Sequence, residues 1–323
     1  MREEIALRDY QLQAIDGLRD GFRAGHRSQL LYLSTGGGKC LARGTPVLLA
    51  SGEIRLAEAI VVGDFVMGDD GTPRTVLALA RGREQMFRVT PTKGDPYVVN
   101  ASHILSLRTT PGNWSALLSD GTRVSSEDDI VDVRADVLAA SSKTARHVLK
   151  GWRAPAIEQF YSRDYDDIDQ SVPPYVLGAW LADGTATLAA ISKPACELTR
   201  AWEAWAASLG MNIREDRSGA CPTWHIVSRS EMGAPWNHAR RALDHLGVLD
   251  NKHIPDCYKF GSLEVRRQLI AGMIDGDGHV HHKGCDWISV SERLAKDFVF
   301  VCRSLGLSCY LKPSRKTIRS IGL

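Results

Sequence analysis

The 323-residue sequence has no apolar run that approaches the ~20 residues of a membrane-spanning helix, so we expect no membrane partner. Met1 is followed at once by Arg2, Glu3 and Glu4, rather than by the regions of a signal peptide. The seven cysteines include no Cys-x-x-Cys pair, which argues against a zinc ribbon and a disulfide framework. These absences favour a reduced, cytoplasmic protein.

Net charge is also low, at +2, which argues against a chain that binds nucleic acid along its whole length. The charge is unevenly distributed, because residues 172–323 hold 19 Lys and Arg against 15 Asp and Glu. The end of the chain, KPSRKTIRSIGL, holds four basic side chains and no acidic one. That stretch is either a solvated tail or a strand that contacts phosphates, and charge alone does not decide between them.

Residues 1–39 predict a short α/β segment. A helix is indicated by the apolar residues at helical spacing in RDYQLQAIDGLRDGFRAG, which are Leu12, Ile15, Leu18 and Phe22. A buried strand, QLLYLS, then runs into TGGGK, which contains Gly36, Gly37, Gly38 and Lys39. A strand, a glycine loop and a lysine form the first half of a phosphate-binding loop. Such a loop continues with Ser or Thr, whose hydroxyl binds Mg2+, but Cys40 follows here.

With LRDYQ upstream, this segment resembles the opening of a superfamily 2 DEAD/DEAH-like helicase. The resemblance implies that Gln11 belongs to the glutamine motif and that the Walker A loop ends at Lys39, so that both residues and the three glycines bind ATP. An ATPase also needs an acidic residue after a second apolar strand, and no Asp-Glu pair follows such a strand. ATP is therefore a cofactor only if other sequence completes the helicase.

Residues 40–165 predict an all-β domain of many short strands. Turns that contain glycine recur, as in ASGE, VGD, DDGTP, TKGD and SDG. Between them lie short β-type runs such as TPVLLA, TVLALA, MFRVT, YVVN and HILSL.

The stretch CLARGTPVLLASGEIRLAEAIVVGDFVMGDDG, which begins at Cys40, strongly resembles the first splicing block of inteins. YVVNASHILSL resembles their second block, with His103 as its histidine. The resemblance implies a Hint-type splicing domain that interrupts the host protein directly after Lys39. The Ser or Thr that the phosphate loop needs would then be the first host residue beyond the intein.

The intein resemblance gives three residues a role. Cys40 would attack the carbonyl of Lys39 and turn the amide into a thioester, because a thiol is easily activated by a neighbouring base. His103 would donate a proton to the departing amide nitrogen. The family often has Thr three residues before this histidine, where Asn100 stands here, and we expect weakened rather than lost support for the scissile peptide. For a lone cysteine or histidine, a buried structural role is the ordinary alternative.

Residues 172–323 contain an internal repeat. PYVLGAWLADG (174–184) and RQLIAGMIDGDG (267–278) both predict an apolar helix with a central glycine that ends in Asp-Gly. Each is followed by a second helix ending in SLG. Gly178 and Gly272, with Ala179 and Ala271 beside them, would let the two helices pack closely. This packing would bring together the aspartates at the two helix ends, Asp183 and Asp277.

This repeat resembles the LAGLIDADG homing endonucleases (DOD type), and NKHIP (251–255) also matches that family. The resemblance implies an α+β fold of αββαββα repeats that binds double-stranded DNA. Asp183 and Asp277 would bind Mg2+ and each serve one strand, because paired carboxylates can hold the ions that activate water. Asp275 competes for this role, but its counterpart in the first repeat is Leu181.

Lys252 matches a lysine near the family's active site, where it would orient water or neutralise phosphate. A surface lysine is an equally weighted alternative.

The complete interpretation is a multi-domain chain: a helicase fragment (1–39), a Hint domain (40–165) and an endonuclease (172–323). Its first repeat would span 172–250, and its partial second repeat 251–323. The closing intein blocks are absent from this sequence, so we expect no splicing without a complementary carboxy-terminal intein or helicase fragment, and nicking rather than double-strand cleavage of DNA. An ATP-binding helicase component and a non-catalytic DNA-binding remnant are the alternative functions.

Overall fold

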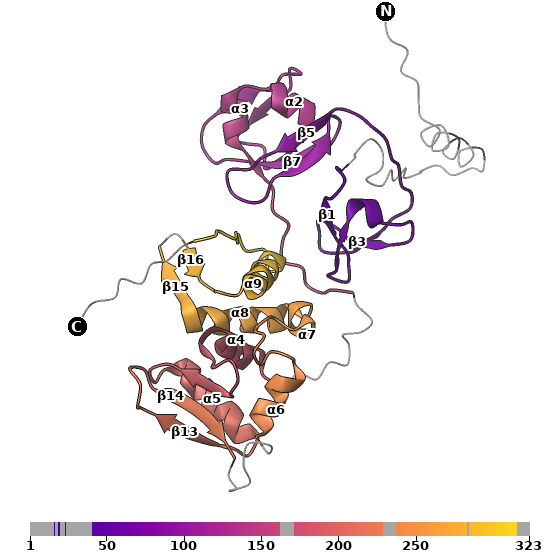
Figure 1. Cartoon of the computed structure of the whole chain (residues 1–323). Coiled ribbons are helices and arrows are strands. Elements are labelled where there is room, and N and C mark those ends of the chain that lie inside the picture. Colours follow the sequence, from indigo (N-terminus) through magenta and orange to yellow (C-terminus); the bar gives the residue numbers. More distant parts are fainter. Residues whose placement is uncertain are drawn as a thin grey trace, which may run out of the picture. The chain divides into compact units, whose positions relative to one another are not determined.

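The computed structural model of the chain describes residues 16, 19, 23, 41–161, 171–228, 237–282 and 284–314 (Figure 1). The predicted helix and phosphate loop, Gln11 and Cys40 included, lie outside these described residues. Two compact units are present: a first unit of residues up to 49, with 54–66 and 74–152, and a second unit of residues 50–53, 67–73 and 153–323. Among the described helices, none has the length and apolar character needed to cross a bilayer.

Short strands dominate residues 41–152, as the glycine turns and β-type runs predicted. The strands are β1 (Pro46–Leu48), β2 (Ile54–Leu56), β3 (Phe65–Met67), β4 (Pro73–Thr75), β5 (Met86–Val89), β6 (Tyr97–Asn100), β7 (Ile104–Thr109), β8 (Ser115–Leu117), β9 (Arg123–Ser125), β10 (Ile130–Arg134) and β11 (Leu149–Gly151). Five antiparallel hairpins or sheets are made by β1-β2, β3-β4, β5-β6, β8-β9 and the three-stranded β10-β7-β11 among the described residues.

Strand β7 illustrates why these residues form a sheet. Leu105, Leu107 and Thr109 are buried, whereas Ser106 and Arg108 are exposed between them. This alternation places every second side chain on the core face of a strand. The core of the first unit forms around it from Val99, Leu105, Leu107, Leu118, Val124, Val133, Ala135, Ala145 and Leu149.

Two features of the first unit differ from the all-β prediction. Helices α2 (Ala135–Ala140) and α3 (Lys143–Val148) follow β10, and a short 3-10 helix, η1 (Ala57–Ala59), follows β2. Ser142 caps α3, because its hydroxyl accepts a hydrogen bond from the Ala145 amide at 3.1 Å. The strand predicted at TVLALA was wrong beyond Thr75: its leucines alternate with smaller residues, but they are exposed and have no core face to cover.

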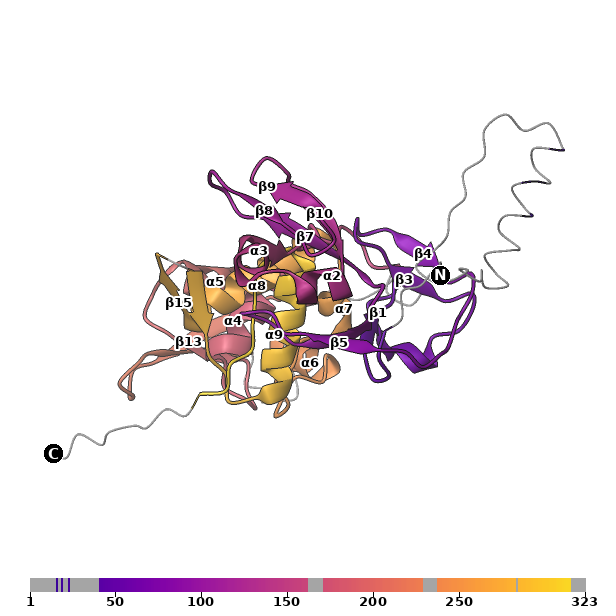
Figure 2. The same cartoon turned by 90° about the horizontal axis from the view of Figure 1, so that it is seen from above.

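The second unit is built from helices and short antiparallel strands. These are α4 (Pro174–Asp183), β12 (Ala190–Ser192), α5 (Glu197–Ser208), β13 (Asn212–Asp216), β14 (Thr223–Val227), α6 (His238–His245), α7 (Asp256–Lys259), α8 (Leu263–Asp277), β15 (Gly278–His281), β16 (Gly284–Trp287) and α9 (Glu292–Ser304). The strands form a β12-β14-β13 sheet and a β15-β16 hairpin. Figures 1 and 2 show α8 beside both α4 and α9.

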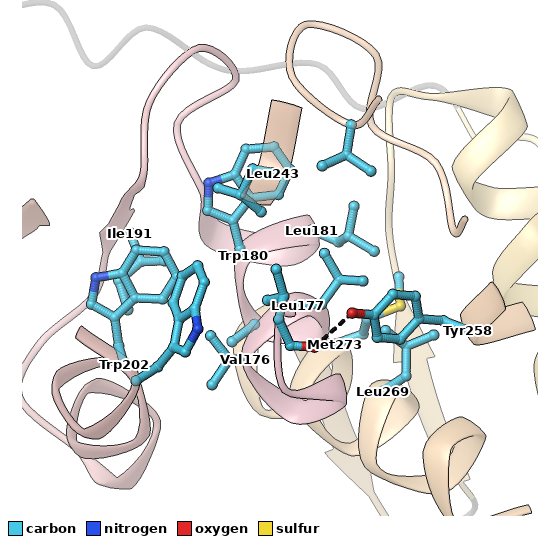
Figure 3. Packing of buried hydrophobic residues seen from close by; sticks show 14 of the residues in the cluster. Val176, Leu177, Trp180, Leu181, Ile191, Trp202, Leu243, Tyr258, Leu269 and Met273 are labelled. Atoms are coloured by element: carbon cyan, nitrogen blue, oxygen red, sulfur yellow. Dashed lines mark hydrogen bonds between the residues drawn. The ribbon is translucent and has the colours of Figure 1, made fainter. Parts of the chain in front are cut away.

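Helix α4 is the centre of this unit. Its residues 176–181 are all buried, and Leu177 and Trp180 are fully enclosed. A helix that is apolar on every side must be covered on every side. Figure 3 shows Trp202 on the α5 side of this core and Met273, Leu269 and Tyr258 on the α8 side.

The two predicted helices touch backbone to backbone at their glycines. A Cβ added at Gly178 would lie 2.1 Å from the Leu269 carbonyl oxygen, and one at Gly272 would lie 2.1 Å from the Tyr175 carbonyl oxygen. Any side chain there would force the helices apart. Ala179 is buried as expected, but Ala271 is exposed, so the placement of Ala271 beside the contact was wrong.

We therefore expect Gly272→Ala to lower the free energy of unfolding of the second unit by about 3 kcal/mol, because overpacking a closed contact moves backbone atoms. Urea denaturation followed by tryptophan fluorescence measures this change. Ala271→Leu adds more bulk one residue away on the exposed face, and should change the stability by less than about 0.5 kcal/mol. Equal losses for the two variants would contradict the role given to the glycine contact.

A buried arginine, which no sequence pattern singled out, links three segments of the second unit. The Arg266 guanidinium donates to the Ser304 hydroxyl at 2.7 Å, to the carbonyl of Gly261 at 2.9 Å and to the carbonyl of Ile157. It also lies 5.1 Å from the Phe160 ring centre. These contacts fix residues 157–160 against α8 and α9.

Candidate functional site

The first candidate site lies where the described chain begins, beside β6. Leu41 forms an antiparallel bridge with Val99, and the Ala42 amide donates to the Val98 carbonyl at 3.0 Å. Leu41 is the sequence neighbour of Cys40. The pairing therefore brings the start of the predicted splicing domain to the strand that ends at Asn100.

Asn100 and His103 lie in one tight turn after β6. The His103 amide donates to the Asn100 carbonyl at 3.2 Å, and the His103 carbonyl accepts from the Ala135 amide at 2.9 Å. Asn100 is fully buried, and its side-chain amide donates to the Ser102 hydroxyl at 3.0 Å. The structure thus brings together two of the three residues predicted for splicing, while the third, Cys40, lies outside the described residues.

The second candidate site lies where α4 and α8 end. Asp183 is the last residue of α4 and Asp277 the last residue of α8. A Cβ added at Gly276 would lie 2.4 Å from the Ala182 Cβ and 3.2 Å from Asp183 Oδ2, which shows how closely the helix ends approach. The two predicted aspartates therefore end on the same side of the helix pair.

The Asp183 side chain is only 14% exposed, and its electrostatic environment is mixed. Burial raises the pKa of the Asp183 carboxyl, Lys193 lowers it, and the neighbouring Asp277 carboxyl raises it again. The coupling between the two carboxyls is what a pair of ligands for one charged group requires.

Lys193, which sequence reasoning missed, lies directly on this site. Its ammonium group donates to Asp183 Oδ2 at 2.9 Å and to the Gly276 carbonyl. Gly184 bridges Ile191, so the chain turns back after α4 and places the residue two positions after Ile191 beside the aspartate. Only this strand pairing reveals the lysine, because nothing in its local sequence is distinctive.

Lys252 also lies at the end of α4, where its side chain is partly buried. Its ammonium group donates to the carbonyls of Leu181, Ala182 and Gly184 at 3.1, 3.4 and 2.7 Å. These are carbonyls that the helix end leaves without intrahelical partners. Burial lowers the pKa of Lys252 to about 8, although Asp277 and Asp183 act in the opposite direction. The equally weighted alternative of a surface lysine is wrong.

Lys252 leads to a pH dependence of stability. Its pKa falls from 10.5 to about 8 on folding, so between these pH values the folded chain binds fewer protons than the unfolded chain. Stability should rise with pH across this window, by up to about 3 kcal/mol from this group, and its burial cost is fully present below pH 8. Urea unfolding of the unaltered chain and Lys252→Met at pH 8 and pH 10 measures it. A difference between the two chains that does not change with pH would contradict the assignment.

Asp275, the competing candidate, has a different partner. Its carboxylate accepts a hydrogen bond from the Tyr175 hydroxyl at 2.8 Å. Burial and this carboxylate raise the pKa of Tyr175 above its usual value. Asp275 thus ties α8 to the first turn of α4, whereas Asp183 ends the last turn of that helix.

The oxygen atoms at the helix ends suit a hard divalent cation. Two carboxylates and the Gly276 carbonyl are the kind of ligand that Mg2+ prefers, and Mg2+ usually completes its shell with water and substrate phosphate. Among the residues that the structure describes, no group of three or more His, Cys, Asp or Glu side chains could hold a metal. A cation at this site would therefore rely on the two aspartates, main-chain oxygen and its substrate.

Comparisons with known proteins assign both parts of the chain. Residues 40–140 match the family model described as Hom_end-associated Hint, and residues 253–322 match the one described as Homing endonuclease. The chain is 29% identical over 294 residues to "Replicative DNA helicase DnaB" of Mycobacterium intracellulare, which covers 87% of this chain and 45% of that protein.

A second relative is the catalytic polypeptide of the V-type proton ATPase of Candida tropicalis. It is 38% identical over 80 residues, which cover 22% of this chain and 7% of that protein. The chain thus spans less than half the length of either relative. The predicted order of segments is confirmed, whereas the LAGLIDADG type, the helicase superfamily and the point of interruption stay predictions. The chain carries a Hint-type segment followed by a homing endonuclease segment.

Proposed function

We propose that the second unit is a Mg2+-dependent endonuclease of the LAGLIDADG type that cuts double-stranded DNA at the helix ends of α4 and α8. The observation that carries this proposal is the meeting of Asp183 and Asp277 at the ends of two helices whose glycines allow backbone contact. Each Asp ends the same element of its repeat. Chance placement of one Asp-Gly at a helix end is common, but the symmetric pair needs a shared cause.

The residues around the two aspartates have complementary roles in this proposal. Asp183 and Asp277 hold the metal, with the Gly276 carbonyl as a further oxygen ligand. A bound Mg2+ supplies an activated water and stabilises the leaving oxygen of the phosphodiester. Lys252 keeps the end of α4 in place through three carbonyls and adds positive charge beside both aspartates. That charge attracts the DNA backbone.

For residues 40–165 we propose intein self-processing that starts with attack of Cys40 on Lys39, inside a helicase whose first residues are 1–39. The turn that holds Asn100 and His103 beside the strand paired with Leu41 supports it. The match to a helicase relative supports the host. ATP and a complementary carboxy-terminal fragment are partners only of the completed protein.

A DNA-nicking assay tests the nuclease proposal. The substrate is a supercoiled plasmid that carries the uninterrupted coding sequence of the helicase phosphate loop, because this is the site that an intein gene would occupy. We expect Mg2+-dependent conversion to the nicked form that EDTA stops, with little linear product. A plasmid whose phosphate-loop sequence is scrambled is the control.

The outcome decides between the nuclease and its alternatives. Binding to the plasmid without nicking, at any Mg2+ concentration, would favour the non-catalytic DNA-binding remnant. ATP hydrolysis without DNA cleavage would favour the ATP-binding helicase component. Efficient linearisation would show that both strands are cut and that our expectation of nicking is wrong.

A further inference from the structure

Lys193 occupies an unusual position in the proposed nuclease site. Its ammonium group donates to Asp183 Oδ2 at 2.9 Å and also to the carbonyl oxygen of Gly276, the residue before Asp277. The lysine side chain is 24% exposed and the aspartate 14%. The ion pair is thus partly shielded from water, and it links the ends of the two helices.

The two oxygens that Lys193 binds are oxygens that a divalent cation would need. Mg2+ binds through carboxylate, carbonyl and water oxygens, and an ammonium group binds through the same acceptors with three donors. A metal ion and the ammonium group repel each other and compete for the same lone pairs. Both cannot take Asp183 Oδ2 and the Gly276 carbonyl in one arrangement.

We propose that Lys193 is a built-in cation that fills the Asp183–Gly276 half of the site and is displaced when a divalent cation binds there. This inference rests on the proposed function, because it treats the two aspartates as the metal ligands. It adds that the two halves of the site differ. The half at Asp183 loads with metal only after the lysine leaves, and the half at Asp277 loads first.

The strand pairing of the two repeats supports this difference. Gly184, directly after Asp183, bridges Ile191, and Lys193 stands two residues beyond. Gly278, directly after Asp277, pairs with Trp287, so Ser289 stands at the matching position. Serine carries no positive charge. The second repeat therefore has no equivalent of the lysine at this register position.

Lys252 does not remove the difference between the halves. In the described part of the chain, its ammonium group donates to main-chain carbonyls at the end of α4 rather than to either carboxylate. Both aspartates feel its charge. It acts on the two halves together, whereas Lys193 bonds to one of them.

Binding of Mn2+ in the absence of DNA tests the proposal. The free Mn2+ concentration is followed by electron paramagnetic resonance as the unaltered chain, Lys193→Met and Lys193→Gln are titrated. We expect both variants to bind Mn2+ about tenfold more tightly, which corresponds to about 1.4 kcal/mol. Lys296→Met removes an equal charge from an exposed ion pair on α9 and should bind as the unaltered chain does.

A second measurement uses the unaltered chain and so does not depend on how the variants fold. An ammonium group that is bonded to a shielded carboxylate gives a separate lysine 15Nζ signal, which Lys193→Gln identifies by its absence. We expect saturating Mg2+ to shift or remove this signal. A signal that Mg2+ leaves unchanged overturns the displacement of Lys193.

The Mn2+ titration has a clear contrary outcome. Affinities in Lys193→Met and Lys193→Gln that equal or fall below that of the unaltered chain would overturn the inference, even if the chain cuts DNA. Tighter Mn2+ binding in both variants of a chain that leaves every DNA intact would uphold the internal cation and contradict the nuclease function. The two proposals therefore fail separately.

Discussion

A chain with Cys40→Ala is expected to retain residues 1–39 under thiol treatment that releases them from the unaltered chain. The Cys40 thiol attacks the Lys39 carbonyl, and the amide becomes a thioester that an added thiol can exchange. Alanine has no nucleophile, so release should fall to the level of ordinary peptide hydrolysis. Mass spectrometry after strong thiol at mildly alkaline pH measures the fraction released.

Two further variants separate the chemistry from the fold. Cys221→Ala removes another partly buried free thiol, in the second unit, and should leave the release unchanged. His103→Ala should slow it by about a hundredfold, because general acid catalysis contributes on that order. If the unaltered chain and Cys40→Ala lose residues 1–39 at the same rate, the splicing assignment is wrong.

Replacing both aspartates, in Asp183→Asn with Asp277→Asn, should lower the rate of DNA nicking by at least about a hundredfold, since loss of metal-site interactions costs this much or more. Asparagine keeps the shape of the side chain but gives up the charge that binds the cation. Plasmid nicking under single-turnover conditions measures the rate. DNA binding should survive, because the phosphate contacts come from basic groups.

The control for this pair is Asp244→Asn, which removes an exposed carboxylate from α6. It should nick DNA as the unaltered chain does. Nicking by the double variant within about threefold of the unaltered rate would remove these aspartates from the mechanism, because a hundredfold effect corresponds to about 2.7 kcal/mol.

The sequence was informative wherever a pattern repeated. The strands β5, β6 and β7 lie at MFRVT, YVVN and HILSL, because alternation and glycine turns are local signals. The α4–α8 contact followed from two matched helices with central glycines. Helices α2 and α3 were missed because six residues are too few to display helical periodicity.

The site was predictable only in part, and for a physical reason. Asp183 and Asp277 stand at equal places in the two repeats, so comparison within the sequence found them. Lys193 has its role through the bridge between Gly184 and Ile191, which is a tertiary feature of the turn after α4. Arg266 is similar, because its acceptors lie as far away in sequence as Ile157.

The most direct test of the central claim compares Asp277→Asn with Asp275→Asn in a nicking assay with each DNA strand labelled at one end. Both substitutions remove one charge from the last turn of α8, but Asp275 is bonded to Tyr175 and Asp277 lies at the paired helix end. We predict that Asp277→Asn abolishes cleavage of one strand and that Asp275→Asn leaves the cleavage of both strands as it was. Loss of cleavage in Asp275→Asn with unchanged cleavage in Asp277→Asn would contradict the paired-aspartate site.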